Sequence, residues 1–586
     1  MGTIQATELP IKDSYQVPLR VPPYQRDYAW TPAQGIKDLW EDLTSHVENS
    51  PEDEYLLGPI VTTSGNDPEV IDGQQRLMSV FVMQAAFRER LLRLHDQEDH
   101  IRALEESLVR YDDDADRSFP TIRHHDPLAT DFLHGLALRK RDDAPVSGTS
   151  ASISSMRLAR AYRWFAGRIE ALGSDPERVW ALVKAIRTQV KYIRIETNDV
   201  SQALMVFERA NYRGKLLDPS ELLKNLIFQH IKTEKFNDVA ESWRSIQKEI
   251  EPIPSVQMLD FLRWYHLSIS DGFYTTRNSF IRLTQNYVKE QKPLEYVSQL
   301  ASGADLLRAM GVDASLTKGG KRISSLSSIA KLGSRQKQHY PLLMALAPWG
   351  ENRFPALARG VERLLYVSAV TEYRSQDLER DIRSLTEEAR SLDATEEGYR
   401  KVAARLDKLC SDIEASQFYR QKFSAISYED NQSLARYVLL KIHGGIYAVW
   451  DNQPEVSADA GAEQYSKAQV EHIWPKSDAE SLSSDSDFVH TIGNLTLLSA
   501  AINASGGASA ATEKIARTYS DEEDKYFIAK NLGRRTVGTK AQHAHRRAID
   551  LVPTGFREWG PEEIQSLAEH YLTLMDKFLP PVLAED

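Results

Sequence analysis

A helical periodicity runs through nearly all of residues 236–445 and separates two regions whose apolar patterns mix strands with helices. It is clearest in long amphipathic stretches at residues 355–371 and 376–414. Such a segment buries its apolar faces by packing helix against helix. We therefore expect a multidomain α+β chain in which an all-α middle joins an N-terminal α/β region to a small α+β tail.

The length of the chain supports this division, because a single hydrophobic core rarely serves 586 residues. We expect three domains, at residues 1–235, 236–450 and 451–586. The second boundary precedes a loop-like stretch at residues 451–462.

No run of apolar residues approaches the ~18 to 20 that a membrane-spanning helix needs. The N-terminus also lacks the basic and then apolar pattern of a secretory signal. The single cysteine, Cys410, has no partner for a disulfide and lies in a strongly helical stretch, so we expect it in the core. These features predict a soluble, cytoplasmic protein that binds no membrane.

The N-terminal region holds two strand candidates, residues 55–63 and 69–71, separated by a turn signal at residues 65–68. An apolar-periodic helix follows at residues 77–94, so the pair predicts a hairpin that leads into a helix. Further along we expect an exposed loop at residues 140–155, helical structure from Met156, a strand at 191–196, and helices at 201–209 and 220–230.

The tail contains a carboxylate beside a histidine, in Val470-Glu471-His472-Ile473-Trp474-Pro475. Glu471 could hold a hard divalent cation through oxygen, and His472, neutral near pH 7, could take a proton from an attacking water. Downstream, Gly493 permits a tight turn and the amide of Asn494 could bridge two loops. The alternative is an ordinary strand end with a solvated Glu471, but the combination favours a metal-dependent phosphodiesterase site.

The net charge of −12 argues against a protein that coats nucleic acid nonspecifically, because that requires many phosphate-neutralising cations. A local basic surface remains open, since residues 530–547 carry several cations and no acidic residue. A charge run is usually a solvated face, but this one follows the phosphodiesterase motif, and we interpret it as a phosphate track. The cations that we assign to DNA are Lys514, Arg534, Arg535, Lys540, Arg546 and Arg547.

A second group of polar residues, Asp72-Gly73-Gln74-Gln75-Arg76, stands where the second strand ends and the helix begins. Gly73 allows close backbone approach, the two glutamines supply amide donors, and Arg76 supplies a fork for phosphate oxygens. Asp72 could hold magnesium or position a water. Taken alone, a helix N-cap by Asp72 with Arg76 paired to it is the better interpretation.

Two other stretches could serve the same anion. Tyr24-Gln25-Arg26-Asp27-Tyr28-Ala29-Trp30 interleaves aromatics with Arg and Gln, which could stack a base and hold phosphate or form the edge of a core. Asn211, Arg213 and Lys215 could close over the anion, or lie in a connecting turn with Gly214 as a helix C-cap.

In this order, these motifs resemble the GmrSD family of modification-dependent (type IV) restriction endonucleases and the related SspE-type phage-defence proteins that sense phosphorothioate DNA. The resemblance rests on Tyr24-Gln25-Arg26, Asp72 to Arg76, Asn211 with Gly214, the region from Asp218 to Asn225, Glu471-His472-Ile473 and Gly493-Asn494-Leu495. The helical middle contributes almost nothing to it.

The resemblance implies a ParB/sulfiredoxin-like head that binds and hydrolyses a nucleoside triphosphate (GTP, UTP or ATP) and helps to sense modified DNA. It implies an HNH (ββα-metal) tail that nicks or cuts double-stranded DNA with Mg²⁺ or Mn²⁺, in a chain that could form a homo-oligomer. Asp72, Gln74, Gln75 and Arg76 would serve hydrolysis, and Tyr24, Gln25, Arg26 and Gly73 would line the nucleotide or modified-base pocket. His472 would be the general base, Glu471 a metal ligand, and Asn494 would orient the loop and the histidine.

The sequence departs from the family at one position. Such tails commonly carry a further asparagine about five residues after Asn503 as the last metal ligand, followed by a lysine, and here Ala508 stands in that place before Lys514. Alanine cannot ligate a metal, so we expect Asn503 or Glu513 to substitute, or the tail to be a weak nuclease. The alternatives are a nucleotide-gated DNA-binding protein with an inactive tail, and a toxin-like nuclease whose head merely folds.

Overall fold

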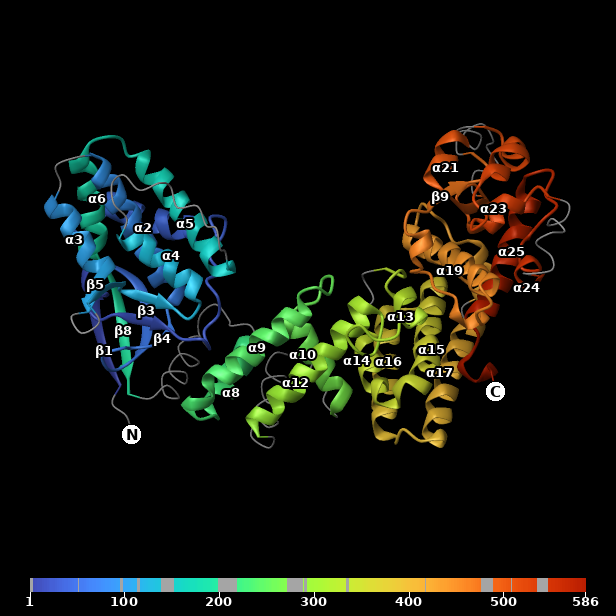
Figure 1. Cartoon of the computed structure of the whole chain (residues 1–586), viewed down its shortest axis with the longest axis horizontal. Helices are drawn as coiled ribbons and strands as arrows, with labels where there is room; N and C mark the ends of the chain where they lie inside the picture. Colours follow the sequence, from blue (N-terminus) through green and yellow to red (C-terminus); the bar gives the residue numbers. More distant parts are fainter. Residues whose placement is uncertain are drawn as a thin grey trace. The chain divides into compact units, whose positions relative to one another are not determined.

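The structure is a computed structural model of the whole chain. It describes residues 4–50, 52–94, 98–112, 116–138, 152–198, 219–270, 288, 292–333, 337–416, 418–475, 488–506, 509–534 and 546–585. The chain forms two compact units, one made of Met1–Arg244 with Phe280–Val297 and the other of Ser245–Ser279 with Ser298–Asp586 (Figure 1).

The sheet of the first unit has the order β1-β8-β3-β4, with β1 at Gln5–Pro10, β3 at Tyr55–Thr63, β4 at Val70–Asp72 and β8 at Val190–Thr197. Strand β8 pairs antiparallel with β1 and parallel with β3, and β3 pairs antiparallel with β4. Alternate residues of β8 are buried because one of its faces meets the core. The predicted hairpin and the predicted strand at residues 191–196 are confirmed.

Helix α2 (Gln74–Leu94) is the centre of this unit, and most of its side chains are buried. It packs against α5 (Ile153–Glu170), α3 (Glu98–Leu108) and α6 (Pro176–Gln189), which gather with it on one side of the sheet (Figure 1). The helix begins three residues before the predicted start at Leu77, so Gln74, Gln75 and Arg76 form its first turn.

The remaining described elements of the first unit are η1 (Ile11–Asp13), β2 (Leu19–Val21), α1 (Ile36–Asn49), β5 (Val109–Asp112), β6 (Arg117–Pro120), β7 (Ile122–His124), α4 (Pro127–Leu138), α8 (Pro219–Gln229), η2 (Thr233–Lys235) and most of α9 (Phe236–Ile250). Strands β2 and β7 form a parallel pair, which leaves His124 at the end of a strand. Helix α5 begins earlier than the predicted Met156, because Ser152 and Ser155 form a reciprocal cap. The predicted helix at 201–209 and most of the predicted loop at 140–155 lie outside the described residues.

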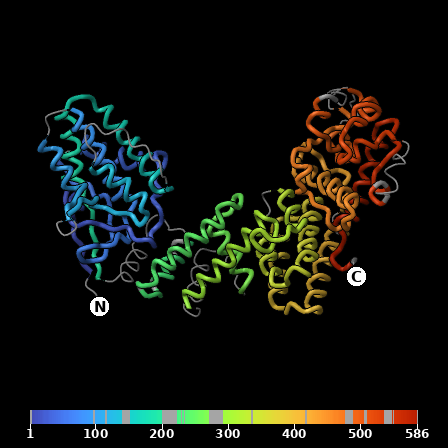
Figure 2. Tube along the Cα trace, in the orientation of Figure 1, coloured from blue at the N-terminus to red at the C-terminus, as the bar shows by residue number. Residues whose placement is uncertain are grey.

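The second unit begins with successive helices, which follow one another along the trace before the orange and red tail (Figure 2). They are α10 (Met258–Ile269), α12 (Pro293–Arg308, which belongs to this unit from Ser298 on), η3 (Ala309–Asp313), α13 (Ser324–Ile329), α14 (Tyr340–Leu346), η4 (Ala347–Trp349), α15 (Gly350–Thr371), α16 (Ser375–Ser391), α17 (Glu396–Ser416), α18 (Tyr419–Ser424) and α19 (Gln432–Trp450). The predicted amphipathic stretch at 376–414 is two helices, because the chain turns at Asp393 and Thr395 Oγ1 accepts from Gly398 N. Cys410 is buried, as predicted.

A fully buried ion pair joins α15 to α19. Lys441 Nζ lies 2.7 Å from Glu362 Oε1 and also donates to the Ala458 carbonyl at 2.8 Å. Tyr437 donates to the same carboxylate at 2.6 Å. Each charge therefore has a partner, which a charge in a protein interior requires.

The tail continues the second unit, because α19 packs against α25, α24 and β10. Its described elements are η5 (Glu455–Ser457), η6 (Glu463–Tyr465), β9 (Gln469–His472), η8 (Ile492–Asn494), β10 (Leu495–Leu498), α21 (Ala500–Gly506), α22 (Ala511–Glu513), η9 (Lys514–Thr518), η10 (Tyr519–Asp521), α23 (Phe527–Asn531), α24 (Arg546–Ile549), α25 (Pro561–Phe578) and η11 (Val582–Glu585). Helices dominate and the sheets are small, so the multidomain α+β class is confirmed in this coarse form. The domain boundaries stay predictions. Within the described ranges, no helix has both the length and the apolar content that a membrane crossing requires.

Candidate functional site

The tail motif lies on a two-stranded antiparallel ribbon. Strand β9 carries Glu471 and His472 opposite Thr496 and Leu495 of β10. Every residue of β10 is buried, so the ribbon is fixed against the core and β9 presents the motif at its end. Consecutive residues of a strand point to opposite faces, so the two side chains leave β9 on different sides although their Cα atoms are only about 3.8 Å apart.

Asn494 ties the loops around the ribbon together. Its Oδ1 accepts hydrogen bonds from Trp474 N at 2.8 Å and Trp559 Nε1 at 2.9 Å. Its Nδ2 donates to the carbonyls of Val489 at 2.7 Å and Trp474 at 3.1 Å. The amide thus bridges the segment that follows His472 to its own loop and to the C-terminal region, the loop-orienting arrangement expected from the sequence.

Gly493 is required by a close approach of the chain. A Cβ atom at this position would lie 2.0 Å from the Ile564 carbonyl oxygen of α25, a contact with backbone that no side-chain movement relieves. The glycine therefore lets η8 sit directly on α25 and fixes the neighbouring asparagine.

On one face of β9, Glu471 meets a buried lysine. Lys514 Nζ lies 2.6 Å from Glu471 Oε1 and donates to the His472 carbonyl at 3.2 Å. Tyr519 OH lies 3.4 Å from the same carboxylate oxygen, and burial followed by this neighbouring charge raises the pKa of Tyr519. Lys514 is only 2% exposed, which corrects its assignment as a DNA-contacting cation, since a side chain held in the interior cannot reach a DNA phosphate.

On the other face, the half-buried His472 ring lies among aromatic rings. The rings of Tyr428 and His490 lie nearly perpendicular to it, with centroids 5.7 and 5.3 Å away. His490 Nε2 lies 3.7 Å from Glu429 Oε2, so a carboxylate borders this face as well. The imidazole therefore has polar groups, the phenol of Tyr428 and the imidazole of His490, among its neighbours, although its Nε2 atom is shielded from solvent.

Asn503 lies on α21 beside the Glu471 face of β9. Its Nδ2 donates to Gln469 Oε1 at 2.7 Å, and Gln469 and Glu471 share a face because they are two residues apart. Its Oδ1 is buried, and no donor to it is found in the part of the chain that the structure describes. A carboxylate and an unsatisfied amide oxygen on one face are the hard oxygen ligands that Mg²⁺ prefers, so the residues present fit the expected cation. Ala508 lies outside the described residues.

The structure describes three cationic side chains of the predicted phosphate track, those of Lys530, Arg534 and Arg547. Lys530 pairs with Asp524 at 2.8 Å. Arg534 is half-buried and lies 3.3 Å from Asn531 Oδ1, whereas Arg547 is exposed and pairs with Glu455 at 3.2 Å. Arg535, Lys540 and the side chain of Arg546 lie outside the described residues. The track stays a prediction.

In the first unit, two of the predicted motifs are joined by amide side chains. Gln25 Nε2 donates to the Ile71 carbonyl at 2.8 Å, and Gln74 Nε2 donates to the Arg26 carbonyl at 2.8 Å. Gln75 Oε1 accepts from the backbone N–H groups of Ala29 at 2.8 Å and Trp30 at 3.1 Å. The structure thus brings residues 24–30 and 72–76 together, although 45 to 48 positions separate the bonded residues.

Two residues of the 72–76 motif, Arg76 and Gly73, hold the local backbone conformation. Arg76 donates to the carbonyls of Leu57 at 3.0 Å and Pro59 at 2.8 Å, across the irregularity in β3. Its fork is therefore occupied by backbone oxygens, which conflicts with a free phosphate fork. Gly73 has φ +88°, and its Cβ would meet the Ile60 side chain at 2.4 Å, so only glycine suits this strand-to-helix turn. Asp72 Oδ1 accepts from Gly73 N at 2.7 Å.

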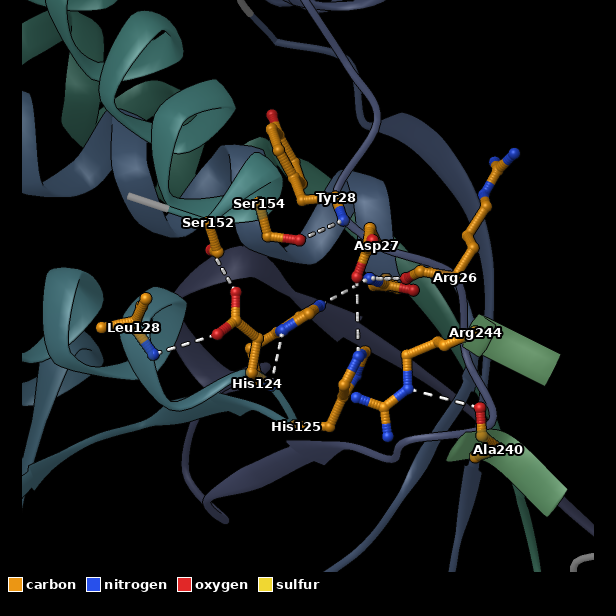
Figure 3. Close-up of polar contacts among 12 residues, drawn as sticks. Arg26, Asp27, Tyr28, His124, His125, Leu128, Ser152, Ser154, Ala240 and Arg244 are labelled. Atoms are coloured by element: carbon orange, nitrogen blue, oxygen red, sulfur yellow. Dashed lines mark hydrogen bonds and ion pairs between the residues drawn. The ribbon is translucent and has the colours of Figure 1, made fainter. Parts of the chain in front are cut away.

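The aromatic run upstream is mostly core. Tyr24 and Tyr28 are buried, and Tyr24 packs on Phe228 and Phe236 with ring centroids 5.1 and 5.2 Å away. Of the two interpretations left open, the core edge therefore holds for these two rings, and they offer no face to a base. Arg26 is exposed and extends away from the neighbouring histidines (Figure 3). Asn211, Arg213 and Lys215 lie outside the described residues.

Sequence reasoning missed a cluster beside these motifs, formed by Asp27, His124 and His125 (Figure 3). The adjacent histidines at the end of β7 were the available signal. Nothing in the sequence connected them to Asp27, because the approach depends on the pairing of β2 with β7.

Both ends of the chain match family models. Residues 8–228 match the model described as the N-terminal domain of GmrSD restriction endonuclease, and residues 412–574 match the model described as the C-terminal domain of GmrSD restriction endonucleases. The second match begins within α17 and takes in α19, in agreement with the packing of α19 against the tail. A search of curated proteins returns no match.

Proposed function

Because the chain belongs to the GmrSD family of restriction endonucleases, we propose that it is a modification-sensing DNA endonuclease of anti-phage defence whose N-terminal unit hydrolyses a nucleoside triphosphate. In this proposal the N-terminal unit is a ParB-like domain and the tail is an HNH nuclease. The observation that carries it is the end of β9, where a carboxylate and an imidazole flank one strand and a buried asparagine holds the surrounding loops.

The tail residues divide the work of phosphodiester hydrolysis. His472 accepts the proton of the attacking water on a ring nitrogen, which makes the water a stronger nucleophile. Glu471 and Asn503 would hold Mg²⁺ or Mn²⁺, which when bound supplies charge neutralisation at the phosphate. Asn494 positions the chain after His472, and Lys514 holds the Glu471 carboxylate in place until a cation shares it.

The N-terminal unit would act as the sensor. Binding of modified DNA changes triphosphate hydrolysis only if the DNA binds the two nucleotide states with different affinity. We propose double-stranded DNA that carries a phosphorothioate or a modified base as the partner. The hydrogen bonds between residues 24–30 and 72–76 support coupling within the sensor, because a ligand that displaces one segment strains its bonds to the other.

The experiment measures triphosphate hydrolysis by the full chain with GTP, UTP and ATP, alone and with modified or matched unmodified DNA. We expect at least one nucleotide to be hydrolysed, at a rate that modified DNA changes and unmodified DNA does not. Equal rates on the two DNAs would remove the sensing part of the proposal. The absence of hydrolysis with every nucleotide would remove the enzymatic role of the N-terminal unit.

A second candidate is a nucleotide-gated DNA-binding protein whose tail does not cleave. The Lys514 ammonium against Glu471 favours it, because that cation competes for the carboxylate, and Ala508 removes one expected ligand. This candidate predicts DNA binding that depends on nucleotide while plasmid DNA stays intact.

A further inference from the structure

A cluster of Asp27, His124 and His125 lies beside the motif residues of the first unit, and its ligand-type atoms are all within 4.8 Å of one another. His125 Nε2 lies 3.6 Å from Asp27 Oδ1, and the two histidine rings lie against each other with centroids 4.1 Å apart (Figure 3). Two imidazoles and a carboxylate are residue types that commonly bind a transition metal, but as proton donors and acceptors they can also bind other ligands. Which atoms carry protons therefore decides what the cluster can bind.

The protons on His124 follow from its hydrogen bonds. Its Nδ1 accepts from the backbone N–H of Asp126 at 3.0 Å, so Nδ1 has no proton. Burial, with His125 as a second cause, lowers the pKa of His124 to about 3, so the ring is neutral and its one proton is on Nε2. A nitrogen that carries a proton has no lone pair for a metal. His124 Nε2 therefore donates into the cluster.

A second donor faces the first. Gln74 Nε2 lies 3.4 Å from His124 Nε2 and donates one of its two protons to the Arg26 carbonyl at 2.8 Å. Rotating the Gln74 amide by about 180° would place Oε1 where it could accept from His124 Nε2. The same rotation would place Oε1 2.8 Å from the Arg26 carbonyl oxygen, and two acceptor oxygens repel each other at that distance. The observed orientation is therefore the favourable one. Among the described residues, the second amide proton has the thioether sulfur of Met78, 4.0 Å from Gln74 Nε2, as an acceptor, and a thioether accepts only weakly.

The spacing of these two donors suits one shared oxygen acceptor. At about 2.9 Å from each nitrogen, the usual N–H···O distance, an oxygen bridges a pair of donors 3.4 Å apart. Gln74 is 4% exposed, and no donor to its own Oε1 is found in the described chain, so its amide is buried with hydrogen-bonding capacity to spare. Buried donors without a strong acceptor are costly, which favours an oxygen acceptor at this position in the working protein.

The surrounding charges favour an anionic oxygen that arrives with a cation. Lys224 is buried and close enough to help lower the pKa of Asp27, although the hydrogen bond from His125 is the larger cause. Helix α2 begins at Gln74, so its positive end is also here. The ionised Asp27 opposes a bare phosphate but suits a phosphate whose charge is shared with Mg²⁺, as in a magnesium–nucleotide.

We propose that His124 and Gln74 form a two-donor seat for one phosphate oxygen of a magnesium-bound nucleoside triphosphate, with Asp27 and His125 at its rim. The inference rests on the proposed nucleotide-binding function of the first unit and adds His124 to its binding residues. It also assigns the cluster to an anion, although its residue types are those of a metal site.

The test is calorimetric titration of the full chain with magnesium complexes of non-hydrolysable GTP, ATP and UTP analogues, and with inorganic phosphate. His124→Phe keeps the ring and removes the donor, and we expect it to weaken nucleotide binding by about ten- to a hundredfold, as the loss of a hydrogen bond to a charged group does. His100→Phe is the matched control. His100 lies in the same unit and stacks on Trp180 with ring centroids 4.1 Å apart, a contact that phenylalanine retains. We therefore expect His100→Phe to bind nucleotide with the affinity of the wild type.

The outcomes separate the two levels of the proposal. If His124→Phe binds nucleotide as tightly as the wild type does, the proposed contact of His124 and Gln74 with a phosphate oxygen is wrong, but nucleotide binding by the unit is not. If the wild type binds no nucleotide, the nucleotide function on which that contact rests is wrong. Binding of inorganic phosphate as tight as that of the nucleotide would overturn the assignment to a magnesium–nucleotide.

A second measurement does not depend on how the variant folds. In ¹⁵N-histidine-labelled wild-type protein, we expect the neutral tautomer with the proton on Nε2 for the signal that His124→Phe removes. A signal of the other tautomer, or stoichiometric Zn²⁺ binding that this variant abolishes, would overturn the proposal in favour of a metal site.

Discussion

The ammonium of Lys514 lies 2.6 Å from Glu471 Oε1, and both groups are largely shielded from water. The carboxylate that should hold the catalytic cation is thus already neutralised by a cation of the chain itself. Any divalent ion has to share this carboxylate with Lys514 or displace it, because like charges repel strongly at short range away from bulk water. The strength of metal binding in the tail therefore depends on this pair.

Replacing Lys514 with Met should strengthen cation binding. We expect the Kd for Mn²⁺ to fall by about tenfold, or ~1.4 kcal/mol, because the competing charge is gone. Without a cation the variant should lose about 1–3 kcal/mol of stability, since Glu471 loses its main partner. Calorimetric titration and thermal unfolding with and without Mn²⁺ check both effects. Lys525→Met is the control, since Lys525 pairs with Glu523 nearer the surface, and an equal gain there would contradict the account.

Asn494→Ala should unfold the loops around the ribbon. The variant loses hydrogen bonds to Trp474, Val489 and Trp559 and leaves their buried groups unsatisfied, so we expect a loss of about 2–5 kcal/mol. Urea denaturation measures it. Asn531→Ala, also buried, removes side-chain bonds that reach, among the described residues, Phe527 and Arg534, both within four positions, so it should cost less than half as much. Equal losses would show that the bridging amide has no special role.

We expect single and double variants of the buried Glu362–Lys441 pair to differ in their free energy of unfolding. Glu362→Gln or Lys441→Met alone should cost about 3–5 kcal/mol, because each leaves one buried partner without compensation. The double variant should recover a large part of this loss, since neither charge is then buried alone. Denaturant unfolding of the four proteins gives the coupling energy, and a double variant as unstable as the sum of the singles would contradict the prediction.

The pH dependence of stability should carry the signature of buried histidines. Burial lowers the pKa of His443 to about 3, well below the ~6.5 of an unfolded histidine. As the pH falls below ~6.5 the unfolded chain gains a proton that the folded chain refuses, so this contribution is complete above that pH and is lost on acidification. His443→Phe should therefore lose about 2 kcal/mol less than the wild type between pH 7 and pH 5. Equal losses in urea denaturation would show that His443 does not titrate in this way.

The sequence predicted the parts of the fold that depend on local pattern. The strand at 191–196 follows from alternation, and the turn at Gly73 follows from a glycine between a strand and a helix. It did not predict that Trp559 would bond to Asn494, because no local pattern connects residues that far apart. The role of Arg76 was likewise hidden, since an arginine that binds backbone carbonyls and one that binds phosphate look alike in a sequence.

In the candidate sites, too, local sequence predicted the residue types but not the tertiary contacts. The residue types at Glu471 and His472 indicated the chemistry, but the burial of Lys514 against Glu471 emerges only from tertiary packing. The cluster at Asp27 likewise depends on strand pairing and on a proton position that only the Asp126 hydrogen bond reveals.

We propose that the end of β9 cleaves DNA with His472 as the general base. The most direct measurement is nicking of supercoiled plasmid by the full chain with Mg²⁺ or Mn²⁺, with the triphosphate and the modified DNA that support hydrolysis. We expect His472→Ala to reduce nicking by about 10²–10⁴-fold while it folds and binds DNA as the wild type does. His570→Ala, which removes a histidine of α25 that bonds to the Leu551 carbonyl, should retain activity. Nicking that persists unchanged in His472→Ala would contradict the account.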